Sequence, residues 1–225
     1  MIAPANLAER PWRGISFLVL DDAGVTVDAE GNARIPYRLP DGREHNAKVI
    51  CADGRTWYEK RDLDLIPLGL ETLPDAATDP ASVAILIAEG ESDALALREA
   101  FAGTAGPHPI KTFCVLGLPG ARSWQAKWRE HVERFPLIYL AGDGDEAGRA
   151  MNADLKRDLP WARPVWLEWG EDVRGTLQQH GARALDHVLQ DADRDAALWA
   201  SFVLADNIEA CEALLTGREV DHAAA

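Results

Sequence analysis

Cysteine is scarce in this chain, and long apolar runs are missing. The three cysteines, Cys51, Cys114 and Cys211, lie far apart and form no CxxC pair, which argues against a cysteine-rich zinc ribbon and a disulfide framework. No apolar run approaches the roughly 18 residues of a transmembrane helix, and no basic segment precedes an apolar one at the N-terminus. We therefore expect a cytoplasmic protein without membrane contact and without zinc.

Basic residues are also few. Lysine and arginine together number 23, against 37 aspartates and glutamates, which gives a formal net charge of −14. A broad nucleic-acid-binding surface needs clustered cations, so the bulk charge argues against one. An acidic excess commonly serves solubility alone, but bound Mg²⁺ reverses the local field at an acidic site. Net charge therefore leaves both interpretations open.

The first third of the chain predicts a small strand-rich subdomain, residues 1–78. Apolar or alternating stretches are separated by Asp-Gly pairs at 41–42 and 53–54, a combination typical of β-hairpins. The stretches expected to form strands are 17–22, 33–60 and 63–70. Residues 71–82 carry two prolines and small polar residues, which indicates a linker.

From residue 83 the chain alternates between strand-like and helix-like stretches. Continuous apolar runs predict strands that are buried on both faces, at 82–88, 110–117, 136–143 and 163–169. Segments with helical spacing lie between them, at 92–103, 123–135 and 146–159. This alternation indicates βαβ units, and so an α/β fold with a parallel-rich sheet flanked by helices. Residues 182–225 predict a C-terminal helical segment.

Acidic side chains follow three of the four predicted strands. They are Glu89, Glu91 and Asp93 after the first strand, Asp143 and Asp145 after the third, and Glu168, Glu171 and Asp172 after the fourth. The carboxyl ends of the strands meet at one edge of an open α/β sheet, where ligands bind. An isolated Asp-x-Asp after a strand more often caps a helix, and Asp93 alone would be an ordinary acid of a first helical turn. Convergence of three acidic strand ends favours a metal site instead.

The metal would be Mg²⁺ or Mn²⁺. Mg²⁺ is usually held by one or two carboxylates together with water and substrate phosphates, and two such ions about 3.5–4 Å apart can organise an in-line phosphoryl displacement. Glycines beside the acids would leave room for metal or phosphate. Gly90 follows the first acid, and Gly117 and Gly120 follow the second strand. We expect these three glycines to approach a nucleotide phosphate.

Three segments then resemble the Toprim domain, which bacterial-type primases, topoisomerases and some nucleases share. They are ILIAEGESDALAL (85–97), VLGLPGA (115–121) and LIYLAGDGDEAGRAMN (137–152). The hallmark Glu of that domain falls on Glu89, and its Asp-x-Asp falls on Asp143 and Asp145. The sequences of these segments are most similar to those of replicative primases, especially phage-type primase-helicases. GEDVRGTLQQHG (170–181) resembles the segment in which those primases place a further acidic ligand, here Asp172.

The resemblance, over residues 83–181, implies the catalytic core of a primase that makes short RNA primers. Glu89, Asp143 and Asp145 would hold two divalent ions, supported by Asp93 and Asp172. Single-stranded DNA template and nucleoside triphosphates would be the partners. The N-terminal region looks like the smaller subdomain that precedes Toprim in primase cores. Its basic residues would then face template or nucleotide phosphate: Arg34, Arg38, Arg43, Lys48, Arg55, Lys60 and Arg61.

Some features depart from the primase pattern. The chain has no Cys/His cluster with zinc spacing and no P-loop motif, so a zinc-binding module or a helicase would be a separate partner. Where the family often has a second acid or Asn after the ligand at Asp172, this chain has Arg174 and Gly175. A Toprim nuclease, with His108 or His131 near the site, stays an alternative. A non-catalytic binding module of the same fold is a third.

Overall fold

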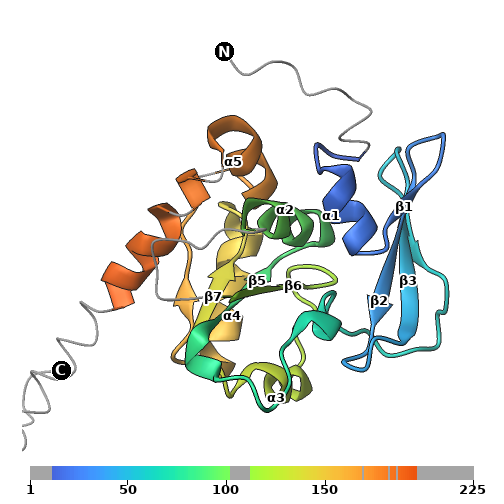
Figure 1. Ribbon diagram of the computed structural model, residues 1–225. Helices are drawn as coiled ribbons and strands as arrows, with labels where there is room; N and C mark the ends of the chain where they lie inside the picture. The colour runs from blue at the N-terminus through green and yellow to red at the C-terminus, as the bar shows by residue number, and fades with distance from the viewer. Residues whose placement is uncertain (1–11, 102–111, 169, 182, 186, 197–225) are drawn as a thin grey trace, which may run out of the picture.

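A computed structural model describes residues 12–101, 112–168, 170–181, 183–185 and 187–196, and two four-stranded sheets organise them (Figure 1). The antiparallel sheet has the order β1-β2-β3-β4, and the parallel sheet has the order β6-β5-β7-β8. The strands are β1 Thr26–Val27, β2 Ala33–Arg38, β3 Glu44–Ile50, β4 Thr56–Tyr58, β5 Val83–Ala88, β6 Thr112–Gly117, β7 Leu137–Ala141 and β8 Arg163–Pro164. The two sheets lie on either side of the predicted linker at 71–82.

Helices connect and cover the strands. They are α1 Phe17–Asp22, α2 Glu91–Phe101, α3 Arg129–Val132, α4 Glu146–Asp158 and α5 Val173–His180, with short 3₁₀ helices at Leu70–Thr72, Pro80–Ser82 and Ala126–Trp128. Residues 183–185 and 187–196 are also helical. The rest of the predicted C-terminal segment, 182–225, lies outside the described residues.

Strand β5 is the centre of the parallel sheet. It pairs in parallel with β6 on one side and β7 on the other, and every one of its residues is 0 % exposed. Ile85 and Ile87 belong to one apolar cluster with residues of α3 and α4. Ala84 and Leu86 belong to a second cluster, with residues of α1, α2 and the antiparallel sheet. Layers on both faces therefore explain the unbroken apolar run, and the predicted α/β fold is confirmed.

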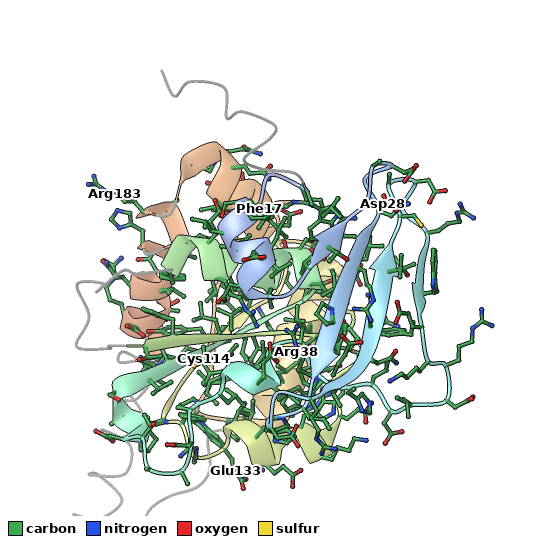
Figure 2. The ribbon with its side chains drawn as sticks, turned by 45° about the vertical axis from the view of Figure 1, so that its right-hand side comes forward. Phe17, Asp28, Arg38, Cys114, Glu133 and Arg183 are labelled. Carbon is green, nitrogen blue, oxygen red and sulfur yellow. The ribbon has the colours of Figure 1, made fainter. Side chains whose placement is uncertain are left out.

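The antiparallel sheet is built from the predicted hairpins. Gly42 and Gly54 have φ values of 83° and 87°, a left-handed conformation that glycine adopts without steric cost. The Asp41 side chain accepts a hydrogen bond from the backbone N of Arg43 at 3.0 Å, which closes its turn. Asp28, labelled in Figure 2, marks the tip of this sheet in the turn between β1 and β2.

The two sheets are joined by packing and by main-chain hydrogen bonds. Ile35 and Tyr37 of β2 lie in the same apolar cluster as Leu86 of β5. Between the sheets the chain runs past the end of β6, where the N of Leu68 donates to the O of Gly117 at 2.9 Å and the N of Gly117 donates back at 3.0 Å. These bonds fix the antiparallel sheet beside the carboxyl end of β6, next to α1 in Figure 1.

Four local expectations were wrong. Residues 63–70 form no strand and contribute only the isolated bridge of Leu68 to Gly117, because Pro67 has no N–H to donate and Gly69 has a φ of 94°. Residues 17–22 form helix α1 instead of a strand, because the apolar side chains that are buried there, Ile15, Val19 and Ala23, recur at helical spacing. The helix expected at 123–135 is reduced to one 3₁₀ turn and the four residues of α3. The strand expected at 163–169 pairs only at two residues of β8, and Trp169 lies outside the described residues. Among the described residues, no helix is long and apolar enough to cross a membrane.

Helix α1 leads to a prediction about two leucines. In a strand, Leu18 and Leu20 would point to the same face; in α1 Leu18 is 79 % exposed and Leu20 is 2 % exposed. We expect Leu20→Ala to lower the free energy of unfolding by about 2–5 kcal/mol and Leu18→Ala to change it by less than about 0.5 kcal/mol. Urea unfolding followed by tryptophan fluorescence measures both, and equal effects would contradict the helix.

Candidate functional site

The five acids predicted as metal ligands lie at the carboxyl edge of the parallel sheet. Glu89 follows β5, and Asp143 and Asp145 follow β7. Asp93 lies in the first turn of α2, and Asp172 directly precedes α5. The backbone N of Asp143 donates to Oε2 of Glu89 at 3.4 Å, so the ends of the two central strands meet. Parallel pairing of β5 with β7 thus brings together acids that are 54 residues apart in the sequence.

Glycines behind these acids make room for neighbouring backbone. The N of Gly144 donates to the O of Glu171 at 2.7 Å, and a Cβ atom at Gly144 would overlap the carbonyl of Glu168. A Cβ atom at Gly148 would overlap the backbone of Asp143. The loop after β7 therefore packs directly on the segment before α5 and on the start of α4. The structure explains these two glycines by backbone packing, without a ligand.

The electrostatics of the edge are unfavourable in the absence of a cation. Burial, and then the charges of Asp93, Glu89, Asp172 and Asp145, raise the pKa of Asp143 from 3.8 to about 7. Burial is also the main cause that raises the pKa of Glu89 and that of Asp93. Oδ1 of Asp143 is buried and has no hydrogen-bond partner. A carboxylate oxygen left in this state is unusual in a folded protein.

Two of the acids also cap helices, as the simpler interpretation predicts. Oδ1 of Asp145 accepts from the N of Gly148 at 2.9 Å at the start of α4. Oδ1 of Asp172 accepts from the N of Gly175 at the start of α5. Each cap engages one oxygen of a two-oxygen carboxylate, so capping and ion binding are compatible at both residues.

The acids do not form a ready-made metal centre. Within the described residues, no three side chains of His, Cys, Asp or Glu gather closely enough to hold an ion by themselves. An ion that is held by one or two carboxylates and completed by water and phosphate needs no such group. The buried, unpartnered oxygen of Asp143 fits that second kind of site.

Arg174, one of the departures from the primase pattern, contacts two of the acids. Its Nη2 is 2.9 Å from Oδ2 of Asp172, and its backbone N donates to Oδ1 of Asp93 at 3.3 Å. A guanidinium group therefore neutralises the side of the acidic cluster that Asp172 provides. The opposite side, formed by Glu89 and Asp143, has no such ion pair among the described residues.

Lys48 and Glu91 form a buried ion pair between the two sheets. Nζ of Lys48 is 2.6 Å from Oε1 of Glu91, and the two side chains are 10 % and 6 % exposed. Tyr37 donates its hydroxyl to the same Glu91 oxygen. Lys48 was expected to contact phosphate; here it joins β3 to α2, and such a contact would require the ion pair to open. Strand alternation is the signal for this placement, because Lys48 lies on the same face of β3 as the buried Ile50.

Of the other residues predicted to contact phosphate, the two basic side chains bind other groups of the protein, and the three glycines differ in the space around them. Arg55 is 78 % exposed at its hairpin and pairs with Asp53 at 2.8 Å, and Lys60 donates Nζ to the O of His45 at 3.1 Å. Gly117 is enclosed by neighbouring atoms. The two remaining glycines differ: a Cβ atom at Gly90 would lie 3.3 Å from Oδ2 of Asp93, whereas nothing lies within 4 Å of one at Gly120.

No protein-family model matches this chain. The Gene 57 protein of Mycobacterium phage D29 is 33 % identical over 99 residues, which are 44 % of this chain and 58 % of that protein. The match thus spans little more than half the length of this curated relative.

Solved structures are similar over most of the chain. The primase fragment of the bacteriophage T7 primase-helicase protein matches with a TM-score of 0.64 at 22 % identity, over 79 % of this chain and 72 % of that one. The chain has the fold of a primase catalytic core. The DnaG primase catalytic domain bound to single-stranded DNA matches with a TM-score of 0.54 at 20 % identity, over 76 % and 57 % of the two chains. A third match comes from the bacteriophage T7 lagging-strand DNA polymerase interacting with primase domains of two gp4 subunits bound to an RNA/DNA hybrid and dTTP. Its TM-score is 0.63 at 23 % identity, over 81 % and 94 % of the two chains. The predicted resemblance to primase cores is confirmed for the fold.

The Lys48–Glu91 pair gives a prediction for stability. Lys48→Met leaves the Glu91 carboxylate buried without a positive partner, with the Tyr37 hydroxyl as its remaining donor, and we expect it to lower the free energy of unfolding by about 3–5 kcal/mol. The double variant Lys48→Met/Glu91→Leu removes both charges and should recover most of that loss. Urea unfolding of both single variants and the double variant measures the coupling; additive effects would contradict the pairing.

Asp143 gives a prediction for pH. Its folded-state pKa of about 7 lies above the ordinary aspartate value of 3.8. The folded chain therefore holds the carboxyl proton of Asp143 more tightly than the unfolded chain does. The contribution of Asp143 to the free energy of unfolding therefore falls as pH rises from about 4 to about 7, and stays level above that. With EDTA present, the wild type should lose more stability between about pH 5 and about pH 8 than Asp143→Asn does. Parallel pH profiles for the two proteins would count against the shift.

Proposed function

We propose that the chain is a metal-dependent nucleotidyltransferase of the primase type, which joins ribonucleotides on a single-stranded DNA template. The observation that carries the proposal is the meeting of acids from the ends of β5 and β7, where Oδ1 of Asp143 is buried without a partner. The primase-core fold supports it. The DnaG catalytic domain of similar fold was solved bound to single-stranded DNA, which is the template class proposed here.

The acids are proposed to serve as ion ligands. Glu89, Asp143 and Asp145 would hold Mg²⁺ or Mn²⁺, with Asp93 and Asp172 in supporting positions and two ions in the complete site. When bound, such ions stabilise the charge that develops on the transferred phosphate and make the attacking hydroxyl more acidic.

The protein chain holds the acidic groups in fixed positions. In the reaction, a 3′-hydroxyl oxygen bonds to the α-phosphorus of a nucleoside triphosphate, the bond to pyrophosphate breaks, and the hydroxyl proton is released. The main-chain bond from Gly144 to Glu171 and the Asp145 cap on α4 hold the loop after β7 rigidly. Rigid placement of the charged groups is the main contribution a protein makes to phosphoryl transfer.

A nuclease would use the same acids on water. The histidines considered for it give no support: His131 lies in α3, which directly precedes β7 and so lies at the amino ends of the strands, and His108 lies outside the described residues. A binding module without catalysis would have no need to keep the Asp143 carboxylate buried and unpartnered. The primase proposal extends to a separate helicase or zinc-binding module as partner.

Asp145→Asn tests the proposed function. Asparagine keeps a side-chain oxygen that can cap α4 but removes the charge, so the fold should persist while activity falls about 100-fold or more. The assay is incubation with labelled ribonucleotides, single-stranded template and Mn²⁺, with product length read on a denaturing gel. Glu133→Gln, in the residue after α3 at the other end of the sheet (Figure 2), is the matched control and should keep full activity. Shortened template without oligoribonucleotides would identify a nuclease, and undiminished synthesis by Asp145→Asn would reject the metal assignment.

A further inference from the structure

A groove lies beside the acidic cluster, on the side of α5. It has a volume of about 550 Å³ and is lined by residues from two distant parts of the chain, Arg13 with Gly14 and the segment from Gly170 to Gln179. Nε2 of Gln178 donates to the O of Arg13 at 2.7 Å, which holds the two parts together. Asp172 lies in the wall of the groove. The groove and the acids therefore share a border.

Two guanidinium groups line this groove. Burial and then the positive charge of Arg174 lower the pKa of Arg13, while Asp93, Glu91 and Asp172 act in the opposite direction. The two arginines are thus close enough to repel one another. The carboxylates of Glu171 and Asp172 line the groove as well, and Asp172 is paired with Arg174 at 2.9 Å. An anion would therefore be attracted to Arg13 and to the N–H groups of Arg174 that Asp172 does not engage.

The backbone of Arg13 has a left-handed conformation, which is unfavourable for a residue other than glycine. Its φ is 50°, and among the described residues other than glycine it alone has a positive φ. Such a conformation costs about 1–3 kcal/mol and is concentrated at functional sites. It places Nη1 of Arg13 at 3.2 Å from the hydroxyl of Ser92 in the first turn of α2. Arg13 is therefore held over the border between groove and acids.

We propose that this groove binds the terminal phosphates of the incoming nucleoside triphosphate, with Arg13 and Arg174 as the phosphate-binding residues. The inference rests on the proposed function, because pyrophosphate must leave from a position next to the acids. Arginine forks match phosphate oxygens in two parallel hydrogen bonds. The volume lies within the range of about 300–1,000 Å³ that small-molecule sites occupy.

Arg174 then has a defined task in the groove. Its guanidinium group neutralises Asp172 at 2.9 Å and lines the groove from α5. Because Nη2 is engaged by Asp172, the remaining N–H donors of the guanidinium group would contact the phosphate. The side of the site near α5 thus combines the two arginines with Glu171 and Asp172, whereas the carboxylates of Glu89 and Asp143 form the other side.

Binding of inorganic tripolyphosphate to the full chain tests the proposal. Isothermal titration calorimetry in EDTA excludes metal ions, and catalysis plays no part in the signal. We expect Arg13→Gln and Arg174→Gln each to weaken binding about tenfold or more, because each removes a charged hydrogen-bonding group. Arg174→Lys keeps the charge without the fork and should fall between. Arg157→Gln, an exposed arginine of α4 with an ion-pair partner three residues away, is the control and should bind as the wild type does.

The outcomes separate this proposal from its rivals. Thermal unfolding of each variant shows first that the fold is kept. Unchanged tripolyphosphate binding in both glutamine variants overturns the proposal. It is also overturned if those variants lose affinity only for a single-stranded oligodeoxynucleotide, since the groove would then hold a strand backbone. Arginine-dependent tripolyphosphate binding by a chain that makes no oligoribonucleotides would support the groove and reject the polymerase.

Discussion

The parallel pairing of β5 with both of its neighbours is the constraint on which the rest of the structure depends. A strand whose residues are all 0 % exposed has no freedom to shift, so its carboxyl end is fixed at the middle of one edge. Glu89 lies there, and Asp143 follows β7 beside it, with its backbone N 3.4 Å from Oε2 of Glu89. The hydrophobic effect, which packs β5 and β7 side by side, thus holds the two acids close to each other. Their repulsion is tolerated because the strands that carry them cannot separate.

The site that results has two chemically different sides. Carboxylates dominate near the ends of β5 and β7, whereas Arg13 and Arg174 line the groove near α5. A formal net charge of −14 describes neither side. Bulk charge averages over the exposed surface, whereas a ligand responds to the few charges within a Debye length of about 10 Å. An acidic protein can therefore bind a polyanion at a local site.

Features governed by neighbouring residues were predictable from the sequence. The unbroken apolar run of β5, the Asp-Gly hairpins and helix α4 carry local patterns, and the structure contains all three. Residues 17–22 were wrongly predicted as a strand because a short apolar stretch fits both the strand and the helix periodicity. Only the burial of the side chains in the structure distinguishes the two. The gathering of the acids at one edge followed from sheet topology. Their roles as ligands stay predictions.

Features that depend on partners distant in sequence were not predictable. Nothing near Lys48 indicates that its partner is Glu91, 43 residues later, although its place in the strand indicates burial. Arg174 was visible as a departure from a pattern, but its contact with Asp172 and its shared groove with Arg13 required coordinates. The left-handed backbone of Arg13 has no sequence signal, because the residue type does not favour it.

The Lys48–Glu91 pair has a consequence for how the molecule comes apart. If the antiparallel sheet detached while the parallel sheet stayed folded, both charges would be separated from the partner that compensates them. The Lys48–Glu91 ion pair therefore opposes separation of the two sheets. The main-chain hydrogen bonds between Leu68 and Gly117 oppose it as well. We therefore expect the two sheets to unfold together as one cooperative unit.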